Sequence, residues 1–411
     1  MREFPPSPPR MRWLNRTVLG IGLASLFSDW SHEIATTVLP AFLASMGAAA
    51  AWLGLIEGVS DGLSSFAKMA SGFYTDRLAR RKKIAVFGYL MTTLGTGSIG
   101  LAISAWQVLI ARSLAWFGRG VRTPVRKALL AASVNPDSYG RAFGLERMMD
   151  TLGAIVGPLS AVLLLQATQS HYATVFAWTM IPGLLAAAVI AFLVQEKDRI
   201  RIPHITFGES LRALPPSFRQ YLIAVTIFGL GDFAHTLLIL LAAQGLAPSL
   251  GAPKAAGFAA GLYVLHNVLY ASFSFISGWL ADRLDKRNLL AGGYFLAGIM
   301  AIIVVFSPLT AMTLAVVFVL GGIYVAVEET LEDSLCAELV TGDQQGMAFG
   351  TLATVNGIGD FASSLVVGFL WTRYGVAVAF GYSTVLFVVG ALLVLRTKPT
   401  CESPACPPSP A

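Results

Sequence analysis

Twelve apolar stretches, each of about 20 residues or more, constrain the fold more than any other feature of the sequence. A stretch of roughly 20 apolar residues crosses the ~30 Å hydrocarbon core of a bilayer as a helix. Within that core a helix satisfies its own backbone hydrogen bonds. The sequence therefore predicts an all-α membrane protein with twelve transmembrane helices. The stretches are 17–45, 51–74, 84–105, 106–133, 140–167, 172–194, 220–243, 255–281, 288–307, 308–340, 347–371 and 376–395.

The composition of the 411 residues also favours a lipid environment. Charged residues make up 13% of the chain, about half of the ~25% that is usual in soluble domains. Gly118-Arg119-Gly120 follows no strand pattern and lacks the Lys-Ser/Thr of a phosphate-binding loop. We therefore expect no enzyme activity, no cofactor and no nucleic-acid partner. Because no nucleotide-binding domain is evident, the energy should come from an ion gradient. We also expect a monomer.

A short basic string occurs twice, half a chain apart. It runs as Gly-Phe-Tyr-Thr-Asp-Arg-Leu-Ala-Arg-Arg-Lys-Lys over 72–83 and as Gly-Trp-Leu-Ala-Asp-Arg-Leu-Asp-Lys-Arg over 278–287. Each copy lies between the second and third apolar stretches of its half. Two copies at matching positions indicate a duplicated unit. The aligned pairs are Gly72 with Gly278, Asp76 with Asp282, Arg77 with Arg283 and Arg81 with Arg287.

The string resembles the Gly-x-x-x-Asp-Arg-x-x-Arg-Arg loop of the major facilitator superfamily, and the resemblance extends over about 17–395. It implies two pseudo-symmetric six-helix bundles, at 17–194 and 220–396, around a central cavity. The remaining segments would be an N-terminal tail (1–16), a linker (195–219) and a C-terminal tail (397–411). The resemblance further implies a secondary transporter that works by alternating access.

Lysine and arginine gather in the loops of one side. Residues 1–16, 77–83, 195–219 and 283–287 are basic, whereas the loops of the opposite side hold little beyond Lys254 and Arg373. Cytoplasmic loops carry this excess of positive charge. We therefore expect a multi-pass protein of the bacterial inner membrane with both termini in the cytoplasm.

The two strings are predicted to form a gate. Their Asp–Arg pairs can cap cytoplasmic helix ends and make inter-helix ion pairs that break when the protein opens inward. The alternative is that the charges only orient the chain, but Asp76 and Asp282 add nothing to a positive-inside signal. The predicted gate residues are Gly72, Asp76, Arg77, Arg81, Gly278, Asp282, Arg283 and Arg287.

Four arginines follow one face of the fourth stretch, at spacings of seven, three and four. A charge at the bilayer centre costs at least about 2.5 kcal/mol, so this face must meet protein or water. The fifth stretch begins with acidic residues one turn apart, which are the expected partners. We favour a structural gate over a substrate site for this set, which comprises Arg112, Arg119, Arg122, Arg126, Glu146 and Asp150.

Two further patterns resemble features of the same family. Its fourth span places an arginine linked to proton transfer close to a Gly-x-Gly, and here Arg112 precedes 118–120 at a longer spacing. Gly153, Gly157 and Pro158 resemble the fifth-span signature of its antiporter branches, without the closing glycine pair. Small residues allow close helix contact and proline loosens the backbone, which is a physical basis for a hinge. This resemblance favours export.

Ionisable residues also lie near the middle of several stretches. Such residues are functional candidates and face the interior or a cavity, although hydrogen bonds that only fix the packing are the alternative. Carboxylates with histidines suit a cation or a proton relay, for which Glu33 and Asp61 are the first candidates. The predicted cavity residues are Asp29, His32, Glu33, Glu57, Asp61, Lys68, Asp232, His235, His266, Glu328 and Asp360, and Glu329 and Glu332 lie beside them.

Proton-coupled efflux of a small solute is therefore the predicted function. One alternative is export of nickel, cobalt or iron, with Asp29, His32 and Glu33 as candidate ligands. The string Asp-Trp-Ser-His-Glu faintly resembles the nickel- and iron-exporting members of the family. Cys401 and Cys406 could bind a soft metal, but a solvated tail without a metal site is the favoured interpretation. From another class, a non-transporting membrane sensor is the alternative, but a static receptor needs no gate in both halves.

Overall fold

The computed structural model describes residues 12–48, 50–78, 80–169, 171–196 and 206–397, and these residues are helical with short connections and no strand. The first half forms α1 (Arg16–Ser45), α2 (Ala50–Arg77), α3 (Lys82–Ser98), α4 (Ala105–Ala131), α5 (Tyr139–Ala167) and α6 (Tyr172–Leu193). The second half forms α7 (Phe207–Arg212), α8 (Pro216–Gly229), α9 (His235–Leu250), α10 (Ala252–Ala281), α11 (Lys286–Phe306), α12 (Ala311–Leu339), α13 (Gln345–Tyr374) and α14 (Val376–Arg396). The predicted all-α class is confirmed.

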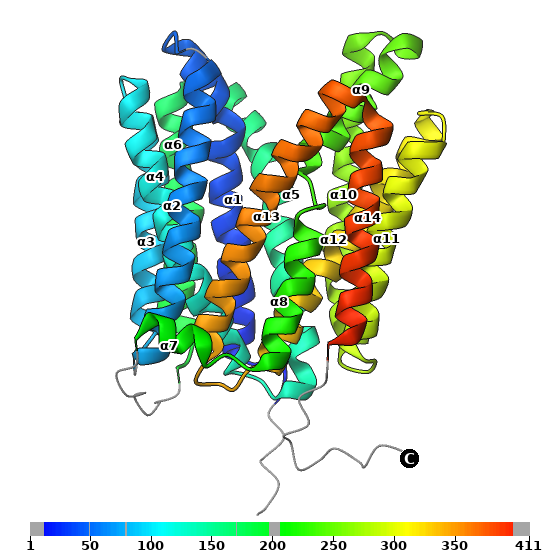
Figure 1. Cartoon of the computed structure of the whole chain (residues 1–411). Coiled ribbons are helices and arrows are strands. Elements are labelled where there is room, and N and C mark those ends of the chain that lie inside the picture. The colour runs from blue at the N-terminus through cyan, green and yellow to red at the C-terminus, as the bar shows by residue number, and fades with distance from the viewer. Residues whose placement is uncertain (1–11, 49, 79, 170, 197–205, 398–411) are drawn as a thin grey trace, which may run out of the picture.

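The helices pack as two bundles that meet at one end. In the first bundle α1 packs on α5 and α6, and α4 packs on α2 and α3; in the second, α10 and α11 pack on α12, and α14 packs on α8 and α11. Across the bundles, α2 packs on α13 and α5 packs on α10. Figure 1 shows the bundles spread apart at the top and joined at the bottom, where α7 also lies. We call these the open end and the closed end.

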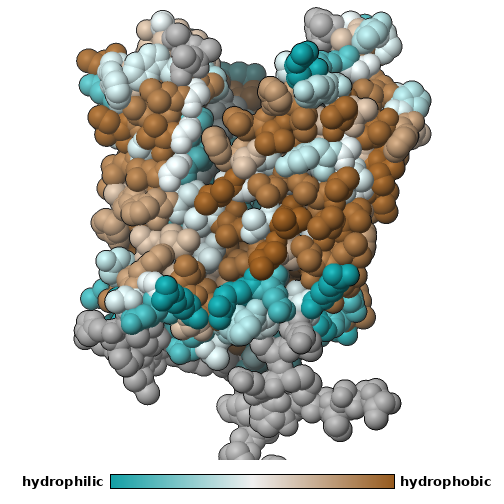
Figure 2. All heavy atoms as spheres, viewed as in Figure 1, coloured by the Kyte–Doolittle hydropathy of each residue, from teal (hydrophilic) through white to brown (hydrophobic). Residues whose placement is uncertain are grey.

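The outer surface is suited to lipid. Eight of the described helices are long and apolar enough to cross a membrane, and Figure 2 shows a hydrophobic band between more hydrophilic ends. The helices α1, α2 and α4 are not among the eight. They carry many of the charged side chains of the first bundle, among them the buried Asp29 and Arg112.

The seventh apolar stretch is not the single continuous helix that the sequence predicts. Its helix stops at Gly229 and resumes at His235, so Asp232 lies in an unwound segment. Inside a membrane, freed backbone groups need other partners, and here side chains of α13 and α14 supply them. Tyr382 donates a hydrogen bond to the carbonyl of Leu230 at 3.0 Å, and the backbone amide of Ala234 donates to Ser364 Oγ at 3.0 Å.

Parts of the predicted N-terminal tail and linker have defined structure. Asn15 caps α1, because its side chain accepts hydrogen bonds from the backbone amides of Thr17 and Val18, and Trp13 packs on Phe275. The linker contains α7, which begins with a capping box between Thr206 and Glu209. Residues 1–11, 197–205 and 398–411, which include Cys401 and Cys406, lie outside the described residues.

Glycines allow the closest contacts between the two bundles. A Cβ atom on Gly278 of α10 would lie 2.2 Å from the carbonyl oxygen of Gly140 on α5. At the equivalent place in the other half, a Cβ atom on Gly72 of α2 would lie 2.5 Å from the carbonyl oxygen of Gly346 on α13. Only glycine permits both approaches, so the duplicated string sets the helix spacing of the closed end.

We expect Gly278→Ala to weaken the closed arrangement by about 1–3 kcal/mol, because the new methyl group meets backbone that cannot rotate away. The measurement is the apparent melting temperature of the purified protein, which should fall by a few degrees. Gly261→Ala is the matched control in the same helix, since a Cβ atom there meets nothing within 4 Å. Equal melting temperatures for the two variants would contradict the contact.

Candidate functional site

The two aspartates of the duplicated string cap helices of the opposite bundle. Asp76 accepts hydrogen bonds from the backbone amides of Gly346 (2.8 Å) and Met347 (2.7 Å) in the first turn of α13. Asp282 accepts them from the amides of Gly140 (2.8 Å) and Arg141 (3.2 Å) in the first turn of α5. The first amides of a helix have no partner within it and carry partial positive charge, which a carboxylate stabilises.

Each cap therefore exists only while the two bundles touch. Asp282 has an additional ion pair with Arg141, whose Nε lies 2.5 Å from Oδ2. The neighbouring arginines do not form the predicted ion pairs across the bundles. Arg77 instead lies over the ring of Phe73, at 3.7 Å, and Arg283 over the ring of Trp279, at 3.4 Å, which are cation–π contacts within one helix end.

The last arginine of each string ties its own bundle together. The Arg81 amide donates to Glu196, directly after α6, at 2.6 Å, and its Nε lies 3.8 Å from the same carboxylate. Arg287 donates to the carbonyl of Thr397, directly after α14, at 2.8 Å and pairs with Asp285. Both copies thus contact the residues directly after the last helix of their own bundle. The hydrogen bonds from Arg287 also hold the pKa of Asp285 below its usual value.

Arg112 and Arg119 of α4 do not reach the predicted partners at the start of α5. Arg112 pairs with Glu57 of α2 at 3.1 Å, and Arg119 pairs with Asp29 of α1 at 3.0 Å. The arginine face of α4 is ~20 Å long. The carboxylates on one turn of α5 cannot reach all the arginines along this face. Arg112 and Arg119 therefore pair with carboxylates of other helices that lie at the same depth.

Only Arg126 takes the predicted partners. It lies 2.7 Å from Glu146 and 3.7 Å from Asp150. Arg122 stacks on the ring of Tyr89 at 4.1 Å.

A second set of ion pairs joins the two bundles through α12. Lys127 of α4 lies 2.6 Å from Asp333 of α12, and Arg147 of α5 lies 2.7 Å from Glu329 of α12. The sequence analysis does not single out Lys127, Asp333 or Arg141. The signal is nevertheless present, because the fourth and tenth stretches occupy equivalent positions and carry opposite charge.

Two carboxylates of the second bundle, Asp232 and Glu332, are held by neutral donors. Tyr324 donates to Asp232 at 3.0 Å. Glu332 accepts from Tyr294 at 2.5 Å and from Asn356 at 2.7 Å. Asp29 and Glu146 of the first bundle are instead paired with the arginines of α4, so these buried carboxylates differ in their partners between the two bundles. Glu328 is also buried in α12.

A cavity of ≈ 960 Å³ lies between the bundles, with walls from α2, α4 and α13. It brings together four residues that the sequence singles out, Asp61, Lys68, Arg119 and Asp360. A smaller cavity of ≈ 190 Å³ adjoins it at Lys68, Arg119 and Asp360 and is lined by the ion pairs that join the bundles. Charged side chains therefore line the part of the larger cavity that adjoins the smaller one.

The three histidines of the predicted cavity set lie in two separate places. In the second bundle the rings of His235 and His266 lie 4.8 Å apart. His32 packs edge-on against Trp116 in the first bundle.

The structure does not assemble the candidate metal ligands. Within the described ranges, no three residues of His, Cys, Asp or Glu gather as a metal site. Asp29, His32 and Glu33 are therefore not gathered as a metal site in this structure, and metal binding by them stays a prediction. The carboxylate of Asp29 is instead engaged by Arg119.

The predicted hinge glycines lie where α5 packs on α1. A Cβ atom on Gly153 would lie 2.4 Å from the Leu26 carbonyl oxygen, and one on Gly157 would lie 2.4 Å from Glu33 Cβ. Pro158 lies inside α5, which continues to Ala167. These contacts explain the small residues by close packing, and the hinge stays a prediction.

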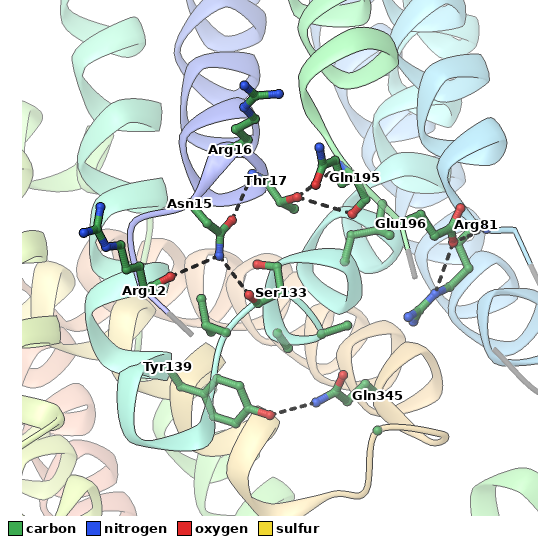
Figure 3. A pocket seen from close by; sticks show the side chains of 15 residues that line it. Arg12, Asn15, Arg16, Thr17, Arg81, Ser133, Tyr139, Gln195, Glu196 and Gln345 are labelled. Carbon is green, nitrogen blue, oxygen red and sulfur yellow. Dashed lines mark hydrogen bonds and ion pairs between the residues drawn. The ribbon is translucent and has the colours of Figure 1, made fainter. Parts of the chain in front are cut away.

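A third cavity, of ≈ 720 Å³, lies at the closed end (Figure 3). Its hydrogen bonds join helix ends of the first bundle: Asn15 donates to the Ser133 carbonyl at 2.8 Å, and the Gln195 amide donates to Thr17 at 3.0 Å. Gln345 reaches across the bundles to donate to Tyr139 at 3.4 Å. We assign this cavity to the closure of that end rather than to the central site.

Comparison with known proteins identifies related chains and folds. The family model of the Major Facilitator Superfamily matches residues 21–235 and 221–410. An uncharacterized MFS-type transporter of Methanocaldococcus jannaschii is 29% identical, over 93% of this chain and 95% of the relative. The multidrug resistance protein MdtH of Citrobacter koseri is 26% identical, over 75% of this chain and 76% of the relative.

Two solved structures share the fold. A crystal structure of the fucose:proton symporter FucP of E. coli superposes with a TM-score of 0.75 at 16% identity, covering 94% of this chain and 100% of that one. FucP in the outward conformation gives a TM-score of 0.74 at 17% identity with the same coverage. The predicted twelve-helix architecture is confirmed by this likeness.

We expect Lys127→Met to destabilise the protein by about 3 kcal/mol, because it breaks a buried ion pair and leaves Asp333 without its nearest cation. The measurement is the unfolding midpoint in detergent. Lys127→Met/Asp333→Leu should recover most of the loss, since no buried charge is then left uncompensated. The exposed Lys254→Met is the control. A double variant no more stable than the single one would contradict the pairing.

Proposed function

The chain belongs to the Major Facilitator Superfamily, and from this premise we propose that it exports a small solute by alternating access, in exchange for protons. The family and fold are those of membrane transporters, which are not enzymes. The exported solute, the direction and the coupling ion are the parts of the proposal that go beyond this membership.

The pair of caps that cross between the bundles carries the proposal. Asp76 of the first bundle holds the start of α13, and Asp282 of the second holds the start of α5. A movement that separates the bundles at this end would break four backbone hydrogen bonds and the Asp282–Arg141 pair at once. A contact that can exist in only one of two arrangements is what a gate requires.

The proposed orientation in the membrane rests on the distribution of lysine and arginine. The α2–α3 and α10–α11 loops at the closed end are basic, from Arg80 to Lys83 and from Arg283 to Arg287, whereas Lys254 and Arg373 lie near the open end. The excess of Lys and Arg marks the cytoplasmic side. We therefore propose that the closed end and both termini face the cytoplasm of a bacterial inner membrane, so that the cavity opens outward.

Proton-coupled export is supported by relatives and by the cavity. The relative MdtH is named as a multidrug resistance protein, and FucP is titled a fucose:proton symporter. Asp61 and Asp360 face the cavity, where a carboxylate can exchange a proton with water. Glu33 and Asp61 remain our first relay candidates, followed by Glu328 and Asp360.

We expect Asp76→Asn to reduce transport about tenfold, because loss of a charged cap of ~1–2 kcal/mol shifts the closed and open populations by that factor. Asp282→Asn should act in the same direction. The measurement is efflux from cells at matched amounts of membrane-inserted protein. Asp343→Asn removes an exposed charge beside the α13 cap and is the control. Wild-type efflux in both cap variants would remove the gate from the proposal.

We expect solute movement in proteoliposomes of purified protein to follow an imposed proton gradient and to collapse with a protonophore. Glu33→Gln/Asp61→Asn should uncouple solute flux from the gradient, because it removes the first relay carboxylates without changing their size. The readout is solute flux together with internal pH. If the double variant stays fully proton-driven, the relay must be moved to Glu328 or Asp360, and gradient-independent flux in the wild type would reject coupling.

A further inference from the structure

Three charged side chains face the ≈ 960 Å³ cavity without a hydrogen bond or salt bridge to any other described residue: Asp61, Lys68 and Asp360. Two other cations, Arg119 in the wall of this cavity and Lys127 in the adjoining smaller cavity, are paired. Arg119 is paired with Asp29 at 3.0 Å, and Lys127 beneath it is paired with Asp333 at 2.6 Å. A charge inside a membrane protein is costly unless it meets a partner or water. The three unpaired groups are therefore the ones available to a solute.

The three groups lie at different depths. The helix α2 runs from the open end to the closed end, so Asp61 lies ~10 Å nearer the opening than Lys68, seven residues later. A Cβ atom on Gly357 of α13 would lie 4.0 Å from Lys68 Nζ. Asp360 follows Gly357 by about one turn toward the opening, a rise of ~4–5 Å. The unpaired groups of the cavity are thus one positive charge at its floor and two negative charges above it, while Arg119 is paired with Asp29.

Apolar surface surrounds these charges. Phe66 of α2 and Phe361 of α13 are 69% and 70% exposed, and both line the cavity. Trp116 of α4 and Ile358 and Leu365 of α13 line it as well. Small-molecule sites combine such apolar walls with a few placed polar groups that fix the orientation.

From this arrangement we infer that the transported solute is a zwitterionic amphiphile, an apolar ring-bearing molecule with one anionic and one cationic group ~5–10 Å apart. The inference rests on the proposed transport function and names its substrate class. The anionic group binds Lys68 at the floor, the cationic group binds Asp360 or Asp61, and the rings contact the aromatic walls.

Solutes with a single charge fit this cavity less well. A purely cationic solute leaves Lys68 unpaired beneath it, and a purely anionic one must pass two carboxylates. The three side chains sum to a charge of −1, from one lysine and two aspartates. A zwitterion therefore leaves one carboxylate free, which can carry the coupling proton in the opposite direction.

Rhodamine B and its ethyl ester test the inference, because they share rings and a cationic nitrogen group and differ only in the carboxylate. The measurement is dye fluorescence anisotropy on titration with the purified full chain in detergent. We expect rhodamine B to bind about tenfold more tightly than its ester. Lys68→Met should abolish this preference, because it weakens the binding of rhodamine B and does not weaken that of the ester. Asp360→Asn should weaken both dyes, and the exposed Lys254→Met should change neither.

Equal affinity for the two dyes, preference for the ester, no saturable binding, or an unchanged preference in Lys68→Met would each overturn the substrate class. Gradient-driven dye flux in proteoliposomes is measured in parallel and tests transport separately. If the ester is transported along the gradient but rhodamine B does not bind more tightly than the ester, the transport function is supported and the zwitterionic substrate class is rejected. Selective binding of rhodamine B that depends on Lys68, with no driven flux of either dye, keeps the recognition and rejects the transport function.

Discussion

The unsatisfied backbone amides at the first turns of α5 and α13 are the constraint on which the closed end depends. A helix cannot satisfy these groups itself, and both helices begin at the interface between the bundles. The capping carboxylates, Asp76 and Asp282, come from the opposite bundle in each case. The glycines of the same strings bring the backbones close enough for this contact. One repeated sequence thus supplies both the approach of the helices and the polar groups that hold them.

The interior above the caps is organised by charge. The basic face of α4 is neutralised by carboxylates from three other helices of the first bundle and from α12. Lys127 of α4 and Arg147 of α5 link the first bundle to the second. The second bundle holds Asp232 and Glu332 with tyrosine and asparagine donors instead. A carboxylate bound only by neutral donors is not tied to a cation, so protonation there breaks no ion pair. The two halves share a fold and differ in the chemistry they can perform.

The sequence was sufficient for the fold class, because the length of the apolar stretches leaves helices as the only form, and the duplicated string reveals the repeat. It also singled out Asp61, Lys68, Arg119 and Asp360, which meet at the cavity. The ion pairs between helices could not be predicted from the sequence of each helix alone. Each charged side chain in these pairs meets a residue that lies at the same depth on another helix. For the same reason the break at Asp232 was missed: its backbone partners lie on α13 and α14. Metal export was an alternative based on the types of side chain in Asp29, His32 and Glu33 and on a faint family resemblance, and in the structure Asp29 is paired with Arg119.

The central claim is that the caps set the balance between two arrangements of the bundles. It is tested most directly by spin-label distances in lipid, between Arg80→Cys and Asp343→Cys at the closed end and between Ser104→Cys and Ser249→Cys at the open end. We predict that replacing both capping carboxylates by asparagine lengthens the first distance and shortens the second in the same molecules. Unchanged distance distributions at both ends would contradict the account.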